Sequence, residues 1–399
     1  MKLSKKIENC RLSPIRKFYP YAVEARQRGI FIHALNIGQP DIHTPAAYVE
    51  AIRSYKEKVL SYAPSPGIPS MIEAVRNYYA RLGVQYDPSD IVITTGGSEA
   101  LLMAFLSILD EGCEIIVPEP FYPNYHTFIS MAGGVIRPIT TSPEDGYRYA
   151  ERNRIEPLIN EKTRAILITN PGNPTGTFLH SDEVRLLADI AKENNLFLIC
   201  DEVYREFIYD GAMTTAAILE DVQEHLVMID SVSKRFSACG ARIGALISRN
   251  KALIEGATKI AQARLSVATL DQVGAEALYD VDSSYFDATR EEYRRRRDVC
   301  YAKMKQIPGV VVAEPKGAFY MMAKLPIDDA EDFQLFLLNE FDDNGETVMF
   351  APGSGFYATE GAGRSEIRLA YVLCTEQLSR ALDVLAKGLE AYLKKKEKK

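Results

Sequence analysis

The chain contains a series of short, continuous apolar runs, each of which ends at polar or turn-forming residues. Helical stretches separate these runs, which cover residues 91–94, 114–117, 165–168, 196–200 and 226–229. Apolar runs of this length are typical of strands that are buried on both faces, as in a parallel sheet covered by helices. The pattern therefore predicts an α/β fold with a mostly parallel sheet.

Polar residues lie just past the ends of three of these runs. Asn173, Asp201 and Lys234 follow the third, fourth and fifth runs in turn. Because ligands bind beyond the carboxyl ends of the strands in such sheets, one ligand is expected to touch all three side chains. Considered alone, each residue is more often a turn residue, a helix cap or a surface charge, but their coincidence at three strand ends favours a shared function.

The lysine lies in an unusual local sequence. It ends the tetrapeptide Ser231-Val232-Ser233-Lys234, and Arg242 follows eight residues later. A desolvated lysine can act as a nucleophile and form a Schiff base with an aldehyde, while hydroxyl groups and an arginine suit a phosphate. Pyridoxal phosphate requires this combination, so it is the predicted cofactor.

The other polar residues have roles that fit the same cofactor. Asp201 can pair with a protonated pyridine nitrogen, and Asn173 and Tyr204 can hydrogen-bond the phenolic oxygen of the ring. Lys234, once displaced by a substrate amine, is free to move a proton at the substrate's α-carbon. Tyr122, which follows the second run, could stack on the ring, although such an aromatic residue more often packs in the core.

A glycine-rich turn follows the first run. Gly97 and Ser98 lie in it, and residues 100–109 are expected to form a helix. Free N–H groups at a helix N-terminus attract anions, which places the phosphate here, with the two serines and the arginine of the lysine segment around it. The turn does not fit the Walker pattern and no G-x-G-x-x-G occurs, so neither a nucleoside triphosphate nor NAD is indicated.

At these positions the chain resembles the class I, fold-type I aminotransferases, the aspartate aminotransferase family. The resemblance extends from about residue 36 to the C-terminal helix. It implies an α/β fold with a large domain, built on a mostly parallel seven-stranded sheet, and a smaller α/β domain. The matching motifs are Asn173-Pro174-Thr175-Gly176, Asp201-x-x-Tyr204, Ser231-x-Ser233-Lys234 with Arg242, and Arg368-Leu369-Ala370.

The resemblance also implies a role for each matching residue. Lys234 is the Schiff-base lysine, and Tyr62 resembles the tyrosine that reaches the phosphate of the neighbouring subunit, which implies a homodimer. Arg368, with Asn173 and the Gly38 backbone beside it, is expected to bind the substrate's α-carboxylate, for which a planar guanidinium is suited. The remaining cofactor-binding residues are Gly97, Ser98, Tyr122, Asp201, Tyr204, Ser231, Ser233 and Arg242.

The implied activity is transamination between an amino acid and a 2-oxo acid, with 2-oxoglutarate as the expected acceptor. Aspartate is the favoured donor. Alanine stays open, because Ser98 replaces the lysine of an aspartate-specific bacterial subgroup and Ala241 replaces a tryptophan that many members have. Residues 35–38 and 263–266 are also similar to alanine aminotransferase-like members.

Two alternatives to transamination are a lyase and a non-catalytic regulator. A lyase of the same fold, of the C–S lyase or cyclopropane-forming synthase type, would use the same Lys234 but direct the carbanion elsewhere. A non-catalytic regulator is disfavoured, because such proteins usually carry a DNA-binding module and the enzyme-like region begins almost at the first residue.

The length of 399 residues predicts two domains. The strand and helix pattern assigns residues 46–285 to a large cofactor-binding domain. Residues 290–399 mix strand and helix signals, and the family resemblance implies that residues 1–45 pack with them as the smaller domain. Residues 286–307 are expected to form a connecting helix.

Composition narrows the possible partners. A net charge of −7 argues against nucleic-acid binding, and no apolar run approaches the roughly 20 residues of a membrane span. The N-terminus lacks the apolar stretch of a signal peptide, and the six scattered cysteines form no C-x-x-C pair. These features predict a cytoplasmic protein with reduced thiols, and the five histidines show no metal-ligand spacing.

Two basic clusters are interpreted as solvated surface. The run at residues 294–297 consists of four arginines and could be taken for a nucleic-acid patch, but pairing with Glu291 and Glu292 on an exposed helix face is the better interpretation. The lysine-rich tail at residues 394–399 is expected to be a frayed helix end.

Overall fold

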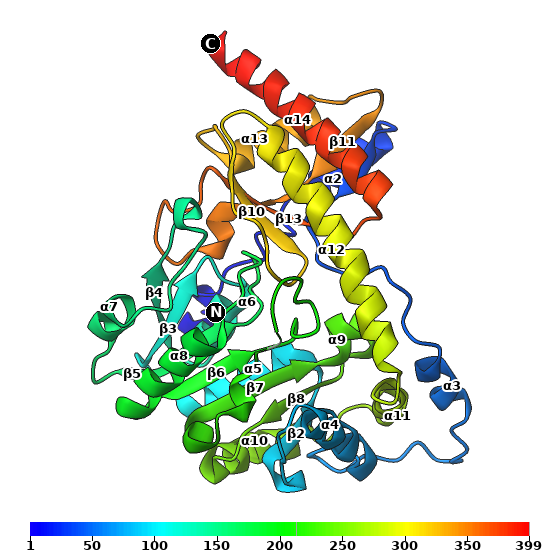
Figure 1. Cartoon of the computed structure of the whole chain (residues 1–399), viewed down its shortest axis with the longest axis vertical. Helices are drawn as coiled ribbons and strands as arrows, with labels where there is room; N and C mark the ends of the chain where they lie inside the picture. Colours follow the sequence, from blue (N-terminus) through cyan, green and yellow to red (C-terminus); the bar gives the residue numbers. More distant parts are fainter. Residues whose placement is uncertain (213, 399) are drawn as a thin grey trace.

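The computed structural model describes residues 1–212 and 214–398 (Figure 1). Its largest element is a seven-stranded sheet in which one strand, β8, runs antiparallel to both neighbours and the other adjacent strands are parallel. The predicted mostly parallel α/β sheet is therefore confirmed. In spatial order its strands are β2 (Ile91–Thr94), β8 (Gly244–Ile247), β7 (Leu226–Ser231), β6 (Phe197–Asp201), β5 (Thr163–Thr169), β3 (Glu114–Glu119) and β4 (Val135–Thr140).

Helices cover this sheet on both faces, which explains the continuous apolar runs. Along β7, Met228 belongs to one apolar cluster and Val227 to another, since successive side chains of a strand point to opposite faces. The first cluster includes α4 (Pro69–Arg81), α8 (Ser181–Glu193) and α11 (Thr269–Leu278). The second includes α5 (Gly96–Ile108), α6 (Asn124–Met131) and α10 (Lys251–Arg264).

A second group of elements lies above this sheet in Figure 1 and has an apolar cluster of its own. It contains a four-stranded sheet in the order β12 (Ala351–Pro352), β13 (Glu366–Ala370), β10 (Tyr320–Lys324) and β9 (Val311–Val312). The N-terminal β1 (Phe31–Ala34) pairs in parallel with β11 (Glu346–Met349), so a segment from the first part of the chain packs with one from its last part. Its longer helices are α2 (Tyr19–Gln27), α12 (Ser283–Gln306), α13 (Ala330–Asn339) and α14 (Thr375–Glu397).

Four short helices complete the α-helices of the described residues. They are α1 (Lys5–Glu8), α3 (Ala47–Arg53), α7 (Arg152–Ile155) and α9 (Val232–Arg235). The last of them begins directly after β7 and carries Lys234.

The arginine run in α12 is only half solvated. Arg294 and Arg295 have exposed side chains, and Arg294 pairs with Glu291 at 2.9 Å as predicted. Arg296 and Arg297, however, are only 5% and 3% exposed. The interpretation of the whole run as a solvated face is wrong, because a helix turns by about 100° per residue and four consecutive side chains cannot share one face.

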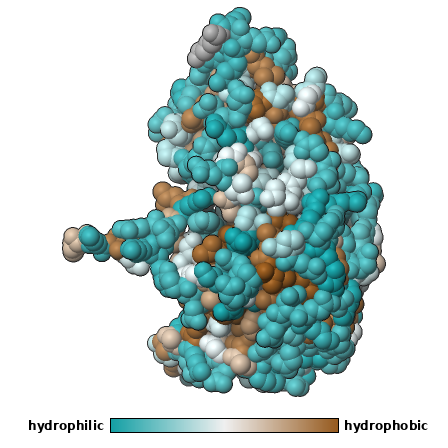
Figure 2. All heavy atoms as spheres, turned by 90° about the vertical axis from the view of Figure 1, so that its left-hand side faces the viewer, coloured by the Kyte–Doolittle hydropathy of each residue, from teal (hydrophilic) through white to brown (hydrophobic). Residues whose placement is uncertain are grey.

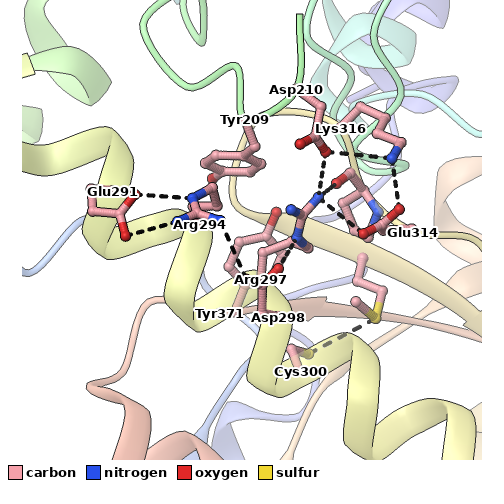
Figure 3. A network of polar contacts seen from close by, with 12 residues as sticks. Tyr209, Asp210, Glu291, Arg294, Arg297, Asp298, Cys300, Glu314, Lys316 and Tyr371 are labelled. Atoms are coloured by element: carbon pink, nitrogen blue, oxygen red, sulfur yellow. Dashed lines mark hydrogen bonds and ion pairs between the residues drawn. The ribbon is translucent and has the colours of Figure 1, made fainter. Parts of the chain in front are cut away.

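The buried Arg297 is compensated by acidic groups from three segments, as Figure 3 shows. Its guanidinium lies 2.6 Å from Asp298, 3.2 Å from Asp210 and 3.6 Å from Glu314, and it donates to the Pro315 carbonyl oxygen at 2.5 Å. A buried cation with this many partners is a structural anchor that joins α12 to the neighbouring loops.

The C-terminal tail also differs from expectation. Helix α14 continues to Glu397, so the tail is not frayed up to that point, and Lys399 lies outside the described residues. Lys394 and Lys395 form ion pairs with Glu390 and Glu340 respectively, which hold the last turns of the helix.

Hydrophobic side chains are unevenly distributed over the surface of the molecule. Figure 2 shows hydrophobic side chains gathered over the lower part of the drawn face, at the height of the seven-stranded sheet, whereas the upper part is mainly hydrophilic. None of the helices in the described ranges is long and apolar enough to span a bilayer. The six cysteines are free, and three of them, Cys113, Cys200 and Cys300, are buried.

Candidate active site

A cavity of about 510 Å³ lies beyond the carboxyl ends of β5, β6 and β7. It brings together every residue of the predicted site except Tyr62, which is 81% exposed on the segment before α4. The predicted residues that line the cavity are Gly38, Gly97, Ser98, Tyr122, Asn173, Asp201, Tyr204, Ser231, Ser233, Lys234, Arg242 and Arg368.

The lysine is held at the start of a tight turn. Ser231 ends β7 in an extended conformation, and its hydroxyl caps α9 by accepting a hydrogen bond from the Ser233 N–H at 3.1 Å. This cap directs the chain away from the sheet and brings the Lys234 amine to the cavity. The Lys234 Nζ donates to the Gly38 carbonyl oxygen at 2.9 Å and lies 3.7 Å from the Cys239 sulfur.

An anion cradle lies beside this lysine, at the N-terminus of α5. Gly96 has φ +74°, and a Cβ atom there would lie 2.4 Å from an Arg242 guanidinium nitrogen. Arg242 has φ +52° and donates to the carbonyl oxygens of Cys239 at 2.9 Å and Thr95 at 3.3 Å. A helix N-terminus, an arginine and two serine hydroxyls therefore converge, which fits the dianionic phosphate of pyridoxal phosphate.

A second close contact, between β8 and the start of α5, positions the anion cradle on the large sheet. A Cβ atom at Gly244 in β8 would lie 2.7 Å from the Gly97 backbone nitrogen. The absence of a side chain at this position lets the start of α5 pack directly on the sheet next to Arg242.

Asp201 ends β6 inside the cavity wall and is 5% exposed. One of its carboxylate oxygens accepts a hydrogen bond from the Tyr125 hydroxyl at 2.6 Å, and the other accepts one from the Val203 N–H at 3.4 Å. Burial raises the pKa of Asp201 to about 6, and the hydrogen bond from Tyr125 opposes that shift. A cation facing this carboxylate, such as a protonated pyridine nitrogen, would favour its ionised form.

Asn173 and Tyr204 form a pair at the neighbouring strand ends. The Asn173 side-chain amide donates to the Tyr204 hydroxyl at 3.3 Å, and that hydroxyl lies 3.0 Å from the hydroxyl of Tyr320. Tyr122 lines the same cavity, and its hydroxyl accepts a hydrogen bond from Asn124 at 2.7 Å. This wall therefore presents polar groups and an aromatic ring to one ligand.

Arg368 lies on the opposite wall, in β13, and is 1% exposed. Its guanidinium donates to the Asn173 side-chain oxygen at 3.1 Å and to the Asn36 carbonyl oxygen at 2.6 Å, and it lies over the rings of Tyr320 and Phe356.

No carboxylate in the described part of the chain pairs with Arg368, and its Nε is buried without a hydrogen-bond partner. Burial lowers the pKa of this guanidinium. A buried cation without a counter-charge is costly, so the cavity is suited to an anionic ligand at this point.

The sequence interpretation missed several cavity residues. Tyr125 contacts Asp201 from within α6, and Tyr320 comes from β10; neither position carries a local signal that separates it from a core tyrosine. Residues 13, 15 and 16 also line the cavity, although they precede the first strand. Their contribution depends on the packing of segments that are far apart in the sequence.

Groups of acidic, histidine or cysteine side chains that could hold a metal are absent from the described residues.

Comparison with known proteins agrees with this geometry. Residues 32–385 match the family of class I and II aminotransferases. A probable aspartate/prephenate aminotransferase of Aquifex aeolicus is 32% identical over 97% of this chain and 98% of its own.

Two solved structures have the same fold over nearly their whole length. An aspartate aminotransferase of Thermus thermophilus with maleate is 29% identical, with a TM-score of 0.88 over 97% of this chain and 100% of that one. An alanine aminotransferase of Pyrococcus furiosus, also 29% identical, has a TM-score of 0.90 over 98% and 100%. The chain thus belongs to the class I and II aminotransferases, and it is an enzyme that uses pyridoxal phosphate to transfer amino groups.

Proposed function

We propose that this enzyme transfers the amino group of aspartate to 2-oxoglutarate, with alanine as an alternative donor. The convergence of Lys234, Asp201 and Arg368 on one cavity carries the proposal, because it provides an amine, a partner for the cofactor ring and a carboxylate-binding cation. The relatives named for aspartate, and the structural neighbour named for alanine, support these two donors.

The cofactor-binding roles follow from the donor groups at each position. When bound, pyridoxal phosphate supplies an aldehyde that condenses with an amine and a ring that withdraws electrons from the substrate's α-carbon. Asp201, which accepts a hydrogen bond from Tyr125, would pair with the ring nitrogen. Asn173 and Tyr204 would hydrogen-bond the phenolic oxygen, and Tyr122 would stack on the ring.

The phosphate is held by groups from two segments. The N-terminus of α5 contributes the backbone of Gly97 and Ser98, and the lysine segment contributes Ser231, Ser233 and Arg242. These groups lie next to β7 and β8, the two strands on which α5 packs (Figure 1).

Two residues would act on the substrate. Arg368 would bind its α-carboxylate, with Asn173 and the Gly38 backbone beside it, and so set the direction of the α-carbon–hydrogen bond. The Lys234 amine would hold the cofactor's aldehyde and, when free, would move the proton at the α-carbon. Its hydrogen bond to Gly38 holds the amine at the junction of the two binding regions.

The working unit proposed here is a homodimer with two-domain protomers. Tyr62 would reach the phosphate of the neighbouring copy, and its exposure together with that of Val59 and Leu60 supports a contact surface on this segment. Residues 46–285 would form the large domain, with residues 1–45 and 290–399 as the small one and 286–307 as the connecting helix. The separate apolar clusters of the two sheets support this division.

A half-reaction assay tests the proposal. The enzyme loaded with pyridoxal phosphate is mixed with aspartate, alanine and a panel of other amino acids, and the cofactor absorbance is followed. Aspartate is expected to convert the bound cofactor from its aldehyde form to its amine form, and 2-oxoglutarate is expected to reverse that conversion. Release of ammonia without any need for an oxo acid would contradict the proposal and favour the lyase alternative.

A further inference from the structure

One cation of the cavity has no role in the site described above. Arg16 lines the cavity together with Lys234, Arg242 and Arg368, but it comes from the segment before α2. Its side chain is exposed and, in the part of the chain that the structure describes, forms no hydrogen bond or ion pair. Its charge is therefore available to a ligand.

The segment that carries Arg16 is anchored on both sides. Phe18 is 2% exposed in an apolar cluster, and Lys17 forms an ion pair with Glu331 at the start of α13. Before it, the ring of Pro14 lies against Gly355, where a Cβ atom would lie only 2.3 Å from the proline. A turn closes this segment, since the Arg16 N–H donates to the Ser13 carbonyl oxygen at 3.1 Å. The position of Arg16 at the cavity is thus set by packing.

The anchoring also places Arg16 on the same wall as Arg368. Ile15 packs in an apolar cluster with Phe356, whose ring lies 5.0 Å below the Arg368 guanidinium. Ala351, in the same cluster, is the register partner of Arg368 in the four-stranded sheet. A substrate held through its α-carboxylate by Arg368 therefore has Arg16 within the same cavity.

The charges of the cavity indicate which group Arg16 binds. Its charged lining residues are four cations, Arg16, Lys234, Arg242 and Arg368, and one anion, Asp201. In the proposed site, the cofactor occupies Lys234, Arg242 and Asp201, and the α-carboxylate occupies Arg368. One positive charge is left, and an additional anionic group on the substrate would balance it.

We propose that Arg16 binds the distal carboxylate of a dicarboxylic substrate and thereby favours aspartate and 2-oxoglutarate over alanine and pyruvate. This inference rests on the proposed transamination and names the residue that determines its substrate class. A guanidinium suits a carboxylate because it can donate two parallel hydrogen bonds. The residues of α5 that line the cavity, Gly97, Ser98 and Leu101, carry no charge, so the positive charge for the distal group comes from the N-terminal segment.

Substitution of Arg16 tests the proposal with two donors that share the α-carboxylate. In Arg16→Met, kcat/KM for aspartate is expected to fall about 30-fold or more, as loss of a charged hydrogen-bonding partner predicts. The value for alanine should change less than about 3-fold, because alanine has no distal carboxylate. Arg16→Lys should restore part of the aspartate activity, since it keeps the charge but loses the planar geometry.

The adjacent Lys17 provides a matched control. Lys17→Met removes a neighbouring positive charge that is already paired with Glu331, so the ratio of aspartate to alanine activity should stay unchanged. Titration of the cofactor-loaded enzyme with maleate, an unreactive dicarboxylate, gives a readout other than activity. Maleate binding should weaken in Arg16→Met to the same extent as aspartate activity falls.

Equal losses with aspartate and alanine in Arg16→Met, or no loss with either, would overturn the inference. A normal affinity of that variant for maleate would do the same. Failure of the proposed function has a different signature: the cofactor-loaded wild-type enzyme would convert neither donor to its oxo acid, whatever the residue at position 16.

Discussion

The two walls of the cavity are built in different ways. Asn173, Asp201 and Ser231 on the cofactor side are 5%, 5% and 3% exposed, and they lie at strand ends whose positions are set by backbone pairing in the large sheet. On the substrate side, Arg16 is exposed and Ile37 is 49% exposed, and both lie on connecting segments. Such segments tolerate sequence change more readily than strand ends do. We therefore expect the large sheet to fix the chemistry and the connecting segments to set the choice of donor.

Arg368 joins the two walls. It belongs to the four-stranded sheet but donates to Asn173, which follows β5 of the large sheet. Substitution of a residue that contacts both regions should lower activity with every substrate. Substitution of a residue of one wall should change either the chemical step or the choice of donor. This distinction can be tested by single substitutions.

The largest effect is expected from Lys234→Ala on the cofactor side. Because the Lys234 amine is proposed to bind the cofactor and to move the α-proton, its loss should lower transamination of aspartate and alanine about 10⁴-fold or more. Single-turnover absorbance measurements with each donor would measure the loss. Lys259→Ala, which removes an exposed lysine paired with Glu255, should retain full activity. Substantial activity in Lys234→Ala would remove that residue from the chemical step.

Arg368→Gln should lower kcat/KM by about 100-fold for aspartate and alanine alike, because both donors present the same α-carboxylate. Steady-state kinetics of the variant and the wild type with each donor measures these two changes in kcat/KM. Arg364→Gln serves as the control, since Arg364 is exposed and pairs with Asp329 away from the cavity. A loss confined to aspartate would instead assign Arg368 to the distal carboxylate and remove the contrast with Arg16.

Asp201 should make the stability of the cofactor-free enzyme depend on pH. Its pKa is raised from 3.8 to about 6 in the folded chain, so ionisation is disfavoured by folding. The folded state then holds the proton that the unfolded state has lost, and the free energy of unfolding falls as pH rises from about 4 to about 6. Above that window, Asp201→Asn should be more stable than the wild type by on the order of 3 kcal/mol.

Denaturant unfolding of the cofactor-free wild type and of Asp201→Asn across this pH range measures the difference. Asp221→Asn should behave in the opposite sense, because hydrogen bonds from Arg185 and Lys192 hold the pKa of Asp221 below its usual value. If wild type and Asp201→Asn kept a constant stability difference between pH 4 and pH 7, the Asp201 carboxyl would not be shifted as described.

The smallest effect is expected from Tyr62→Phe. Loss of one hydroxyl hydrogen bond to the phosphate should weaken cofactor binding about 3- to 10-fold, and only in the dimer. Titration of the cofactor-free enzyme with pyridoxal phosphate, at protein concentrations above and below dimer dissociation, would show this dependence. Tyr19→Phe, another exposed tyrosine, should leave the affinity unchanged. An equal effect of Tyr62→Phe in the monomer would contradict a role across the interface.

Much of the large sheet could be predicted because its central strands are continuous apolar runs. The strands β4 and β8 do not stand out in this way. β4 lies at the sheet edge and carries Arg137 and Pro138 on a largely exposed strand, while β8 is only four residues long and begins with Gly244. Charged residues, proline and glycine weaken the apolar signal on which strand prediction depends, whereas the four residues of the edge strand β2 are all buried and the strand was recognised.

The arginine run at residues 294–297 shows a second limit of prediction from sequence. The charges and helical spacing of residues 294–297 correctly predicted the Arg294–Glu291 pair, but not the burial of Arg297. Its acidic partners Asp210 and Glu314 come from segments far away in the chain. Local sequence could not distinguish a solvated arginine from one with buried counter-charges.

By itself, the sequence determined the α/β class, the pyridoxal phosphate chemistry and the positions of Asn173, Asp201 and Lys234. Each of these depends on a short pattern, an apolar strand followed by a functional group, and parallel pairing brings such groups to one edge. Only the tertiary structure decided that Tyr125 supports Asp201 and that Arg16 faces the cavity. These contacts depend on how distant segments pack together, which no local pattern in the chain specifies.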